Sequence, residues 1–328
     1  MNPVTPSPEM IARAADALRN GQLVALPTET VYGLAADATN GRAVAQIYEA
    51  KGRPRFNPLI VHVATLAQAA DLVEMTSLAA RLAQAFWPGP LTLVLRARSD
   101  NGIADLVTAG LATLAVRIPA HPVALSVLRA AGRPLAAPSA NRSGRISPTT
   151  AAHVAGEFGP EVAMILDGGP CGHGLESTIV AVAGNSVTLL RPGVLSVQVI
   201  ESACGVRVGR QAADPLAPSA PGQLLSHYAP SAGVRLNAST VRAGEALMAF
   251  GPRPPPTDGP VVNLSVTGDL VEAAQGLFAA LRTLDAKGAA IIAVMPIPSH
   301  GLGEAINDRL ARAAAPRGER RAVHTGSF

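Results

Sequence analysis

The chain has 328 residues, a formal net charge of +4 and 48% hydrophobic residues, a composition that predicts a globular protein of about two domains and excludes a largely disordered chain. No apolar run reaches the length of about 20 residues that a transmembrane helix needs, and the N-terminal stretch MNPVTPSPEM lacks the regions of a secretory signal. Two cysteines, Cys171 and Cys204, make neither a disulfide framework nor a metal cluster, so we expect a cytosolic protein with free thiols.

Apolar runs alternate with helical patterns along residues 1–205, which predicts an α/β domain. The predicted helices are residues 8–20, 40–50, 66–86 (one helix or two), 121–131, 147–159 and 196–202. The predicted strands are residues 22–27, 59–63, 91–97, 113–119, 164–169, 177–183 and 187–193, and residues 28–37 are expected to form a turn. Because several connections are short, we expect a large twisted sheet of mixed direction.

The composition changes at residues 206–226, which are rich in Pro, Ala and Ser and have no periodicity, as in a linker. A second α/β pattern follows. Its predicted strands are residues 234–237, 247–251, 260–264 and 289–297, and its predicted helices are residues 269–287 and 303–315. We therefore expect a catalytic domain over 1–205, a linker or lid over 206–232, and a smaller parallel-sheet, Rossmann-like domain over 233–328.

The common nucleotide, zinc-protease and serine-hydrolase motifs are absent from the sequence. Polar clusters instead follow four apolar runs, at residues 27–33, 134–144, 174–180 and 189–193. Each cluster alone indicates a turn as readily as a site. Together they predict a site at strand ends, where open α/β sheets bind ligands.

Three cations, Lys51, Arg53 and Arg55, fall within five residues beside a predicted strand. Only two of the 27 basic residues are Lys, so a lysine here suggests that a compact point charge is needed, although chance is an equal explanation. His62 within an apolar strand is more typical of a core residue than of a ligand-binding one. Arg117, flanked by apolar residues, needs an anionic partner, either a protein carboxylate or a ligand carboxylate.

Taken in order, the segments PTETVYGL, KGRPRFNPL, FWPGPLTLVL, LAVRIPAHP, LAAPSANRSGRISPT, ILDGG, GLESTIV, LLRPG and SHYAP resemble the YrdC-type threonylcarbamoyl-AMP synthases. The resemblance is close over residues 10–230 and looser beyond, and the layout resembles the two-domain branch of that family. The K-x-R and S-x-N signature of the family falls on Lys51, Arg53, Ser139 and Asn141.

The resemblance implies a nucleotidyltransferase that converts L-threonine, bicarbonate (or CO2) and ATP into threonylcarbamoyl-AMP and pyrophosphate, for threonylcarbamoyladenosine at position 37 of tRNA. It implies Lys51 and Arg53 as catalytic residues. The residues implied for ATP are Lys51, Arg53, Asn57, Thr113, Ser139, Asn141, Ser147, Arg191 and Tyr228. The residues implied for L-threonine are Thr30, His62, Arg117, Ala137 and Ser177.

Mg²⁺ is expected to arrive with ATP, and we expect no protein residues as dedicated metal ligands. The machinery that transfers the threonylcarbamoyl group to tRNA is an expected partner, and no membrane partner is expected. We expect Arg55 to be solvated, and Ser147 to begin a helix whose free N–H groups favour an anion. The segment 206–226 is expected to fold over the active site as a lid, with Tyr228 reaching the nucleotide; the alternative is that Tyr228 anchors the C-terminal domain.

Two other classes of function stay open. An RNA-binding module is disfavoured by the low aromatic content of 3% and by the near-neutral balance of residues 1–205, with 15 basic and 14 acidic side chains. A carbamoyltransferase-like enzyme that uses a carbamoyl adenylate is disfavoured by the absence of zinc-finger cysteines and of an acylphosphatase-like segment.

Overall fold

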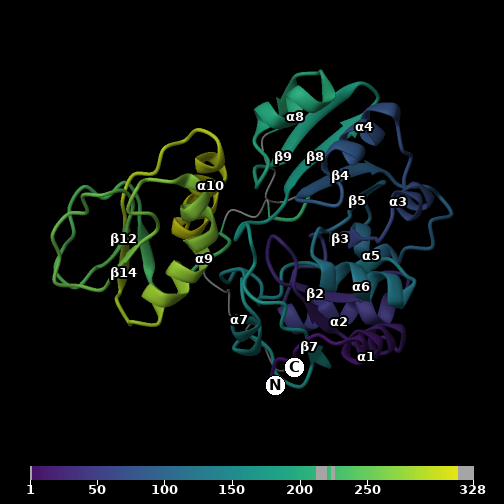
Figure 1. Cartoon of the computed structure of the whole chain (residues 1–328), viewed down its shortest axis with the longest axis horizontal. Coiled ribbons are helices and arrows are strands. Elements are labelled where there is room, and N and C mark those ends of the chain that lie inside the picture. Colours follow the sequence, from purple (N-terminus) through teal and green to yellow (C-terminus); the bar gives the residue numbers. More distant parts are fainter. Residues whose placement is uncertain (1, 212–219, 223–225, 317–328) are drawn as a thin grey trace, which may run out of the picture.

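A ten-stranded mixed sheet forms the first of two structural units in the computed structural model, which describes residues 2–211, 220–222 and 226–316. The strand order is β10-β9-β8-β4-β5-β3-β6-β2-β1-β7 (Figure 1). The strands are β1 (Val24–Leu26), β2 (Gly33–Asp37), β3 (Ile60–His62), β4 (Leu91–Arg96), β5 (Thr113–Arg117), β6 (Leu135–Ala136), β7 (Met164–Ile165), β8 (Thr178–Ala183), β9 (Ser186–Arg191) and β10 (Val208–Arg210).

Helices cover the two faces of this sheet unequally. The helices of this unit are α1 (Pro8–Arg19), α2 (Gly41–Lys51), α3 (Leu66–Leu72), α4 (Ser77–Phe86), α5 (Asp105–Thr108), α6 (Pro122–Ala131), α7 (Ala151–Ala155) and α8 (Val197–Cys204). One face packs against α2, α3, α4, α5, α7 and α8 in the largest apolar core. On the other face, α1 and α6 cover the part made by β1, β2, β6 and β7. The remainder of that face is therefore available for a site.

A small apolar cluster covers part of the face that α1 and α6 leave free. It joins Ile60, Val94, Ala115, Ile179 and Leu190 of the sheet to Ala220 of the segment between the two units. Because side chains alternate along a strand, His62 and Arg117 point to the same side as Ile60 and Ala115. The strand ends that carry these two side chains consequently border the free part of the face.

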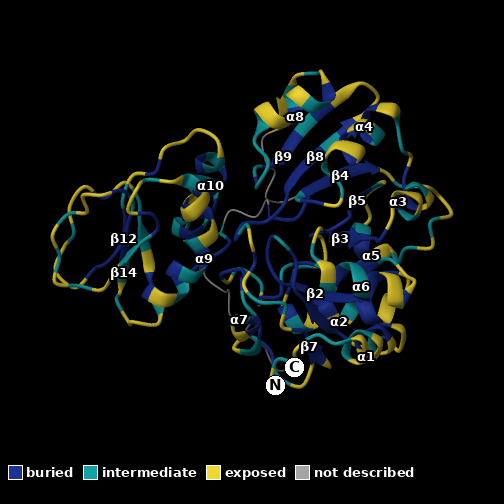
Figure 2. Ribbon diagram, viewed as in Figure 1, coloured by how far each residue is buried: buried dark blue, intermediate teal, exposed yellow. Residues whose placement is uncertain are grey.

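The second unit is a four-stranded sheet in the order β11-β14-β12-β13, with all pairs parallel. Its elements are β11 (Gly233–Arg235), β12 (Ala246–Ala249), β13 (Val261–Asn263), α9 (Leu270–Asp285), β14 (Ile291–Val294) and α10 (Leu302–Ala314). The predicted combination of a mixed sheet and a smaller parallel sheet is confirmed. Figure 2 shows that the inner strands of both sheets are buried, whereas edge strands such as β10, β11 and β13 and the outer helix surfaces are partly exposed.

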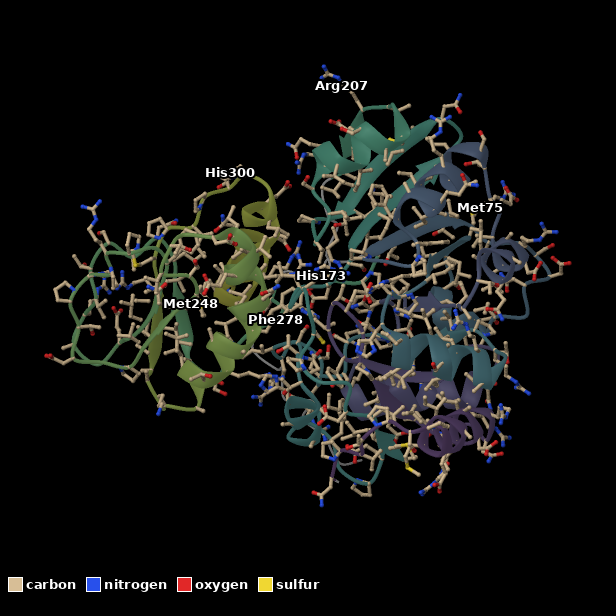
Figure 3. All side chains as sticks on the ribbon, in the orientation of Figure 1. Met75, His173, Arg207, Met248, Phe278 and His300 are labelled. Atoms are coloured by element: carbon tan, nitrogen blue, oxygen red, sulfur yellow. The ribbon has the colours of Figure 1, made fainter. Side chains whose placement is uncertain are left out.

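Helices α9 and α10 lie between the second sheet and the first unit (Figure 1). Their apolar cluster includes Val31, Ile146 and Leu175 of the first unit as well as Tyr228. Gln275 of α9 also donates a hydrogen bond from its side chain to the carbonyl of Gly172, 2.8 Å away. In Figure 3, Phe278 and His173 mark this contact region. The two units thus share a continuous apolar contact.

Three local predictions are wrong. Residues 33–37 are strand β2 and not part of a turn, because the Ala-rich segment GLAAD is fully buried between β1 and β6, where tertiary pairing outweighs low strand propensity. The helix predicted for 147–159 covers only Ala151–Ala155, because it begins after Thr150, whose hydroxyl caps it by accepting a hydrogen bond from the N–H of His153. Residues 208–210 pair with β9 and extend the first sheet into the segment predicted as linker.

The contact between the units is tightest at Gly174. This residue has φ +69°, and a Cβ atom there would lie 2.5 Å from the Cα and the carbonyl oxygen of Gln275. Gly172, two residues earlier, has open space where a Cβ atom would lie, and its φ is outside the left-handed region. Of these two glycines, the packing of α9 therefore requires only Gly174.

We predict that Gly174→Ala destabilises the protein by about 2 kcal/mol or more, since a left-handed backbone conformation and a backbone collision both oppose the new side chain. Gly172→Ala is the matched control and should change the free energy of unfolding by less than about 0.5 kcal/mol. Chemical denaturation of both variants measures the difference. Equal stability of the two would contradict the packing described here.

Candidate active site

A cavity lies on the free part of the first sheet, between the strand ends and the segment that connects the two units. Its empty volume is about 530 Å³, which includes the space at its mouth. Nine of the predicted site residues line it: Thr30, Arg53, His62, Arg117, Ala137, Ser139, Ser177, Arg191 and Tyr228.

Four further predicted residues stand directly behind the lining. Lys51 and Asn57 contact lining residues, and Asn141 accepts a hydrogen bond from Lys51 through its carbonyl oxygen. Ser147 donates to Glu176, which lines the cavity. Thr113 differs: it lies at the start of β5, at the opposite end of that strand from Arg117, and is not part of the lining. Arg55 is exposed, as expected.

Lys51, the last residue of α2, is buried. Its ammonium group donates to the carbonyl oxygens of Ser139, at 2.6 Å, and Asn141. Burial, and then the charge of Arg53, lower the pKa of Lys51 well below its usual value. In its charged form this amine has three N–H donors. Two of them fix the turn at residues 139–141, and the third has no hydrogen-bond acceptor among the described residues.

Arg53 brings a cation to the cavity without a carboxylate beside it. Its Nη2 donates to Oδ1 of Asn57 and to the carbonyl of Pro58, both at 2.7 Å. Burial lowers the pKa of Arg53 to about 10, so the group stays charged at neutral pH. Arg191 is similar: it donates to the carbonyl of Ser177 at 2.8 Å and to the carbonyl of Pro221 at 3.3 Å.

Within residues 2–211, 220–222 and 226–316, neither Arg53 nor Arg191 has a carboxylate at ion-pair distance. Both side chains are buried, at 8% and 4% exposure. A buried cation without a counter-charge is costly. Two of them facing one cavity indicate that the cavity binds a ligand with several negative charges.

Arg117 has its anionic partner inside the chain. Its Nη2 lies 2.6 Å from Oε1 of Glu29, its Nη1 donates to the hydroxyl of Thr30 at 3.0 Å, and its Nε donates to the carbonyl of Gly89 at 3.1 Å. Of the two partners that the sequence left open, the structure shows the protein carboxylate. Because a guanidinium has five N–H donors, two remain for a ligand.

His62 lies beside Arg117 in the parallel pair of β3 and β5. Burial, and then the charge of Arg117, lower the pKa of His62 to about 3. Its Nδ1 atom is buried and has no hydrogen-bond partner among the described residues. The imidazole is therefore neutral at physiological pH, and it has an atom available for a polar ligand.

Tyr228 lines the cavity and also packs against the second unit. Its ring stacks on Phe278 of α9, with a centroid distance of 5.5 Å, and its backbone has φ +61°. A Cβ atom at Gly222 would lie 3.0 Å from the Tyr228 hydroxyl and 2.9 Å from Cδ of Arg191. The described residues 220–222 therefore lie against the cavity. Residues 212–219 and 223–225 of the predicted lid lie outside the described part.

The sequence-based prediction missed three residues of this region. Glu176 lines the cavity and accepts hydrogen bonds from Ser147, at 2.5 Å, and from Arg309, at 2.9 Å. His227 also lines the cavity. The segment GLESTIV does place a carboxylate beside Ser177, which is a signal for Glu176. Arg309 lies in an ordinary helical pattern 133 positions later, and nothing local distinguishes it.

The described residues contain no group of three or more His, Cys, Asp or Glu side chains that could hold a metal ion. Both oxygens of Glu176 are already engaged, and Glu29 is paired with Arg117 through one oxygen. These residues do not fit a dedicated Mg²⁺ site. In the same ranges, no helix combines the length and the apolar character that crossing a bilayer requires.

Arginine, serine and threonine side chains around a strand-end cavity of a mixed α/β sheet favour an anionic ligand. Comparison with known proteins identifies the class. The family model Sua5_yciO_yrdC, described as "Telomere recombination", matches residues 16–193. A second model, described as "Threonylcarbamoyl-AMP synthase, C-terminal domain", matches residues 195–315.

Relatives match along the whole length. A threonylcarbamoyl-AMP synthase of Bacillus subtilis is 41% identical, over 94% of this chain and 93% of its own. The protein of the same name from Pyrococcus abyssi is also 41% identical, over 93% and 94%. The solved structure of P. abyssi Sua5 in complex with L-threonine has a TM-score of 0.85 and 39% identity, over 95% and 96% of the two chains. The chain belongs to the Sua5/YrdC family.

The low pKa of His62 predicts a pH dependence of stability. The pKa of His62 is about 3 in the folded protein, and its usual value, expected in the unfolded chain, is 6.5. Between these two pH values the unfolded chain binds a proton at His62 that the folded protein does not bind. Stability is therefore present above this window and is lost as the pH falls through it. We predict that His62→Gln lessens the loss of stability between pH 6 and 5 by up to about 1.4 kcal/mol per pH unit.

Chemical denaturation at several pH values measures this slope. The exposed His300→Gln variant is the control for removal of a histidine as such. If the wild type and the His62→Gln variant lose stability equally steeply on acidification, His62 is not buried in its neutral form.

Proposed function

We propose that this chain synthesises L-threonylcarbamoyladenylate and pyrophosphate from L-threonine, bicarbonate or CO2, and ATP. The product would serve the formation of threonylcarbamoyladenosine at position 37 of tRNA. The observation that carries the proposal is the pair of buried arginines, Arg53 and Arg191, that face the cavity without a carboxylate partner in the described chain. A triphosphate supplies the negative charge that their burial requires.

The reaction needs no nucleophile from the protein. The free amine of threonine adds to CO2, which gives a carbamate and releases a proton. A carbamate oxygen then attacks the α-phosphorus of ATP, the new P–O bond forms, and pyrophosphate leaves with the electron pair of the broken bond. Binding in reacting geometry and neutralisation of charge are sufficient for such a phosphoryl-type transfer. The cavity could provide both, since its walls would orient the substrates and its arginines would neutralise the phosphate charge.

For the nucleotide we propose Arg53 and Arg191 as direct phosphate ligands, together with the third N–H of Lys51. Ser139 lines the cavity as well, while Asn57, Asn141 and Ser147 act one contact behind it and hold the lining in place. Thr113 fits only a part of the nucleotide that extends along β5, beyond the cavity. Lys51 and Arg53 remain the proposed catalytic pair, because they direct the triphosphate toward the carbamate.

For L-threonine we propose the neighbouring side chains Thr30, His62 and Arg117, with Ala137 and Ser177 also in the wall. The two N–H donors that Arg117 does not use for Glu29, Thr30 and Gly89 would bind the carboxylate. The neutral His62 would then contact the threonine without adding a second positive charge. The main-chain N–H of Ala137 already donates to the carbonyl of Ile60. Ala137 would therefore contact the threonine through its carbonyl or methyl group.

We propose that Mg²⁺ arrives on the phosphates of ATP as part of the substrate, since the described residues give it no carboxylate cluster. The segment before Tyr228, whose residues 221 and 222 line the cavity, would act as a lid that excludes water from the labile mixed anhydride. The proposed cellular place is the cytoplasm, with the tRNA threonylcarbamoyl-transfer machinery as the partner that consumes the product.

The test is pyrophosphate release by the purified chain with each substrate omitted in turn. We predict release only when ATP, L-threonine and bicarbonate are all present. Salt-dependent RNA binding with no turnover would instead favour an RNA-binding module. Release that depends on a carbamoyl donor and not on threonine would favour a carbamoyltransferase-like enzyme.

The double variant Arg117→Met/Glu29→Gln completes this test, because it removes the cation without leaving its carboxylate buried and unpaired. Calorimetry with each ligand alone should show threonine affinity lowered by a factor of about 10 or more, as for the loss of a charge-assisted contact, and ATP affinity nearly unchanged. Equal loss of both affinities would mean that Arg117 only stabilises the fold.

A further inference from the structure

The second unit reaches the wall of the cavity through one buried side chain. Arg309 of α10 is the largest fully buried side chain of the described chain, with 0% exposure. Apolar contacts between the units already involve Val31, Ile146 and Leu175. Docking by apolar burial alone does not need a buried guanidinium, whose removal from water is costly.

Arg309 contacts Glu176 and Tyr228 of the cavity lining, its neighbour Asp308, and Pro192, which lies outside the lining. Its Nε donates to Oε2 of Glu176 at 2.9 Å, and its Nη1 donates to the carbonyl of Pro192 at 2.9 Å. Asp308 accepts from Nη1 at 2.7 Å. The guanidinium carbon lies 5.2 Å from the centre of the Tyr228 ring, an arrangement typical of a cation–π contact.

Glu176 transmits these contacts to the site. Its carboxylate lines the cavity and is shared between Arg309 and the hydroxyl of Ser147. The next residue, Ser177, bonds to Arg191. The neighbouring turn is equally constrained, because a Cβ atom at Gly193 would lie 2.5 Å from the carbonyl oxygen of Glu176. Arg309 therefore holds the wall at the turn before Gly193 and at Glu176 itself.

We propose that Arg309 is a positioning residue for the reaction, by which the C-terminal unit holds Glu176 and Tyr228 in the geometry that the nucleotide side of the cavity requires. The C-terminal unit is on this view a part of the active site. This inference rests on the proposed function and names the residue that joins the second unit to it.

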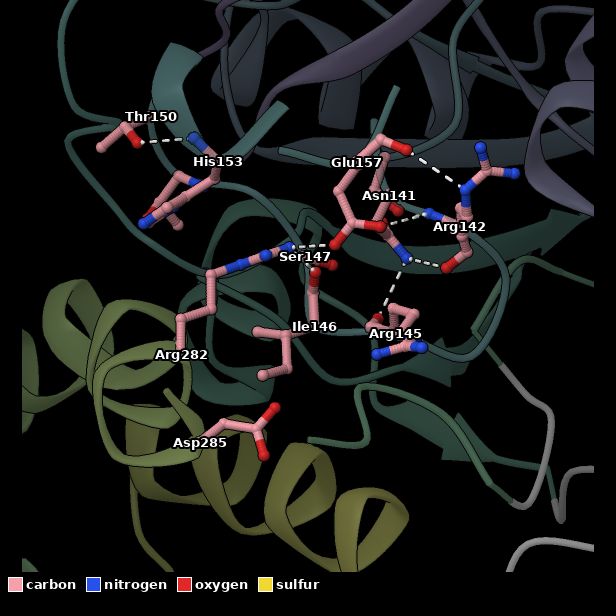
Figure 4. A network of polar contacts seen from close by, with 12 residues as sticks. Asn141, Arg142, Arg145, Ile146, Ser147, Thr150, His153, Glu157, Arg282 and Asp285 are labelled. Atoms are coloured by element: carbon pink, nitrogen blue, oxygen red, sulfur yellow. Dashed lines mark hydrogen bonds and ion pairs between the residues drawn. The ribbon is translucent and has the colours of Figure 1, made fainter. Parts of the chain in front are cut away.

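A matched control exists in the same interface. Arg282 of α9 also joins the two units: its Nη2 lies 2.9 Å from Oε1 of Glu157 and donates to the carbonyl of Ile146. Figure 4 shows this network, in which Glu157 also accepts from the backbone N–H of Arg142. Arg282 is mostly buried, at 20% exposure, and within the described part of the chain its hydrogen bonds and its ion pair reach Ile146 and Glu157, neither of which lines the cavity.

The experiment compares Arg309→Met, Arg309→Lys, Glu176→Gln, Arg309→Met/Glu176→Gln and Arg282→Met in the full chain. Threonine-dependent pyrophosphate release at saturating substrates is the first measurement. We expect Arg309→Met to lower kcat about tenfold or more, Arg309→Lys to recover part of the loss, and Arg282→Met to stay within about threefold of the wild type. In the double variant, the two losses should be far from additive, since both act through one contact.

Hydrogen exchange of the amides at residues 175–178 is the second measurement, and it does not depend on activity. Faster exchange there in Arg309→Met than in Arg282→Met supports the proposal. The proposal is overturned if both arginine variants lose activity in proportion to their loss of stability, or if the Arg309 and Glu176 effects add. A wild type without threonine-dependent turnover refutes the proposed function, and the exchange data then decide on the positioning role alone.

Discussion

Burial of positive charge is the constraint on which this structure depends. Arg53, Arg117, Arg191 and Arg309 all lie in an interior of low dielectric, where a cation needs a counter-charge or a full set of hydrogen bonds. The chain meets this need in two ways. Arg117 and Arg309 have carboxylate partners, Glu29 and Glu176. Among the described residues, Arg53 and Arg191 bond to amide and hydroxyl oxygens and to no carboxylate, so the cavity keeps an attraction for an anion.

The division of the molecule into two units follows the same constraint. The first sheet leaves part of one face free of helices, and side chains of β3 and β5 point into that space. A site open on this side would leave its cations in water, where their attraction for a ligand is weak. Residues 221 and 222, His227 and Tyr228 line this space, and helices α9 and α10 pack against Val31 and Tyr228 of its wall. The second unit therefore supports the wall of the cavity, and we propose that it does so in part by holding Glu176.

The sequence predicts much of this arrangement, and the reasons for its failures are physical. Long apolar runs such as residues 91–97 and 289–297 predicted strands that the structure contains as β4 and β14. The buried segment GLAAD was missed because its strand state comes from pairing on both sides and not from its own propensity. The helix expected to begin at Ser147 begins instead after the capping residue Thr150. The hydroxyl of Ser147 donates a hydrogen bond to Glu176.

For the site, the motifs that carry the family resemblance implied Arg53, Ser139 and Ser177; these residues line the cavity, and their ligands stay a prediction. Local patterns were insufficient where the partner is distant in sequence. Nothing around Arg117 indicates that Glu29, 88 positions earlier, supplies its counter-charge. Nothing in α10 distinguishes Arg309 from a solvated arginine, since its burial results from the docking of one unit on the other.

In the proposed reaction, the cavity joins a threonine carbamate to the α-phosphate of ATP. Mass spectrometry of the product formed rapidly from ¹³C-bicarbonate, L-threonine and ATP tests this reaction. We predict an adduct that contains threonine, AMP and one ¹³C atom, together with unlabelled pyrophosphate. An adduct of threonine and AMP without the ¹³C atom, or the formation of ADP and phosphate, would contradict it.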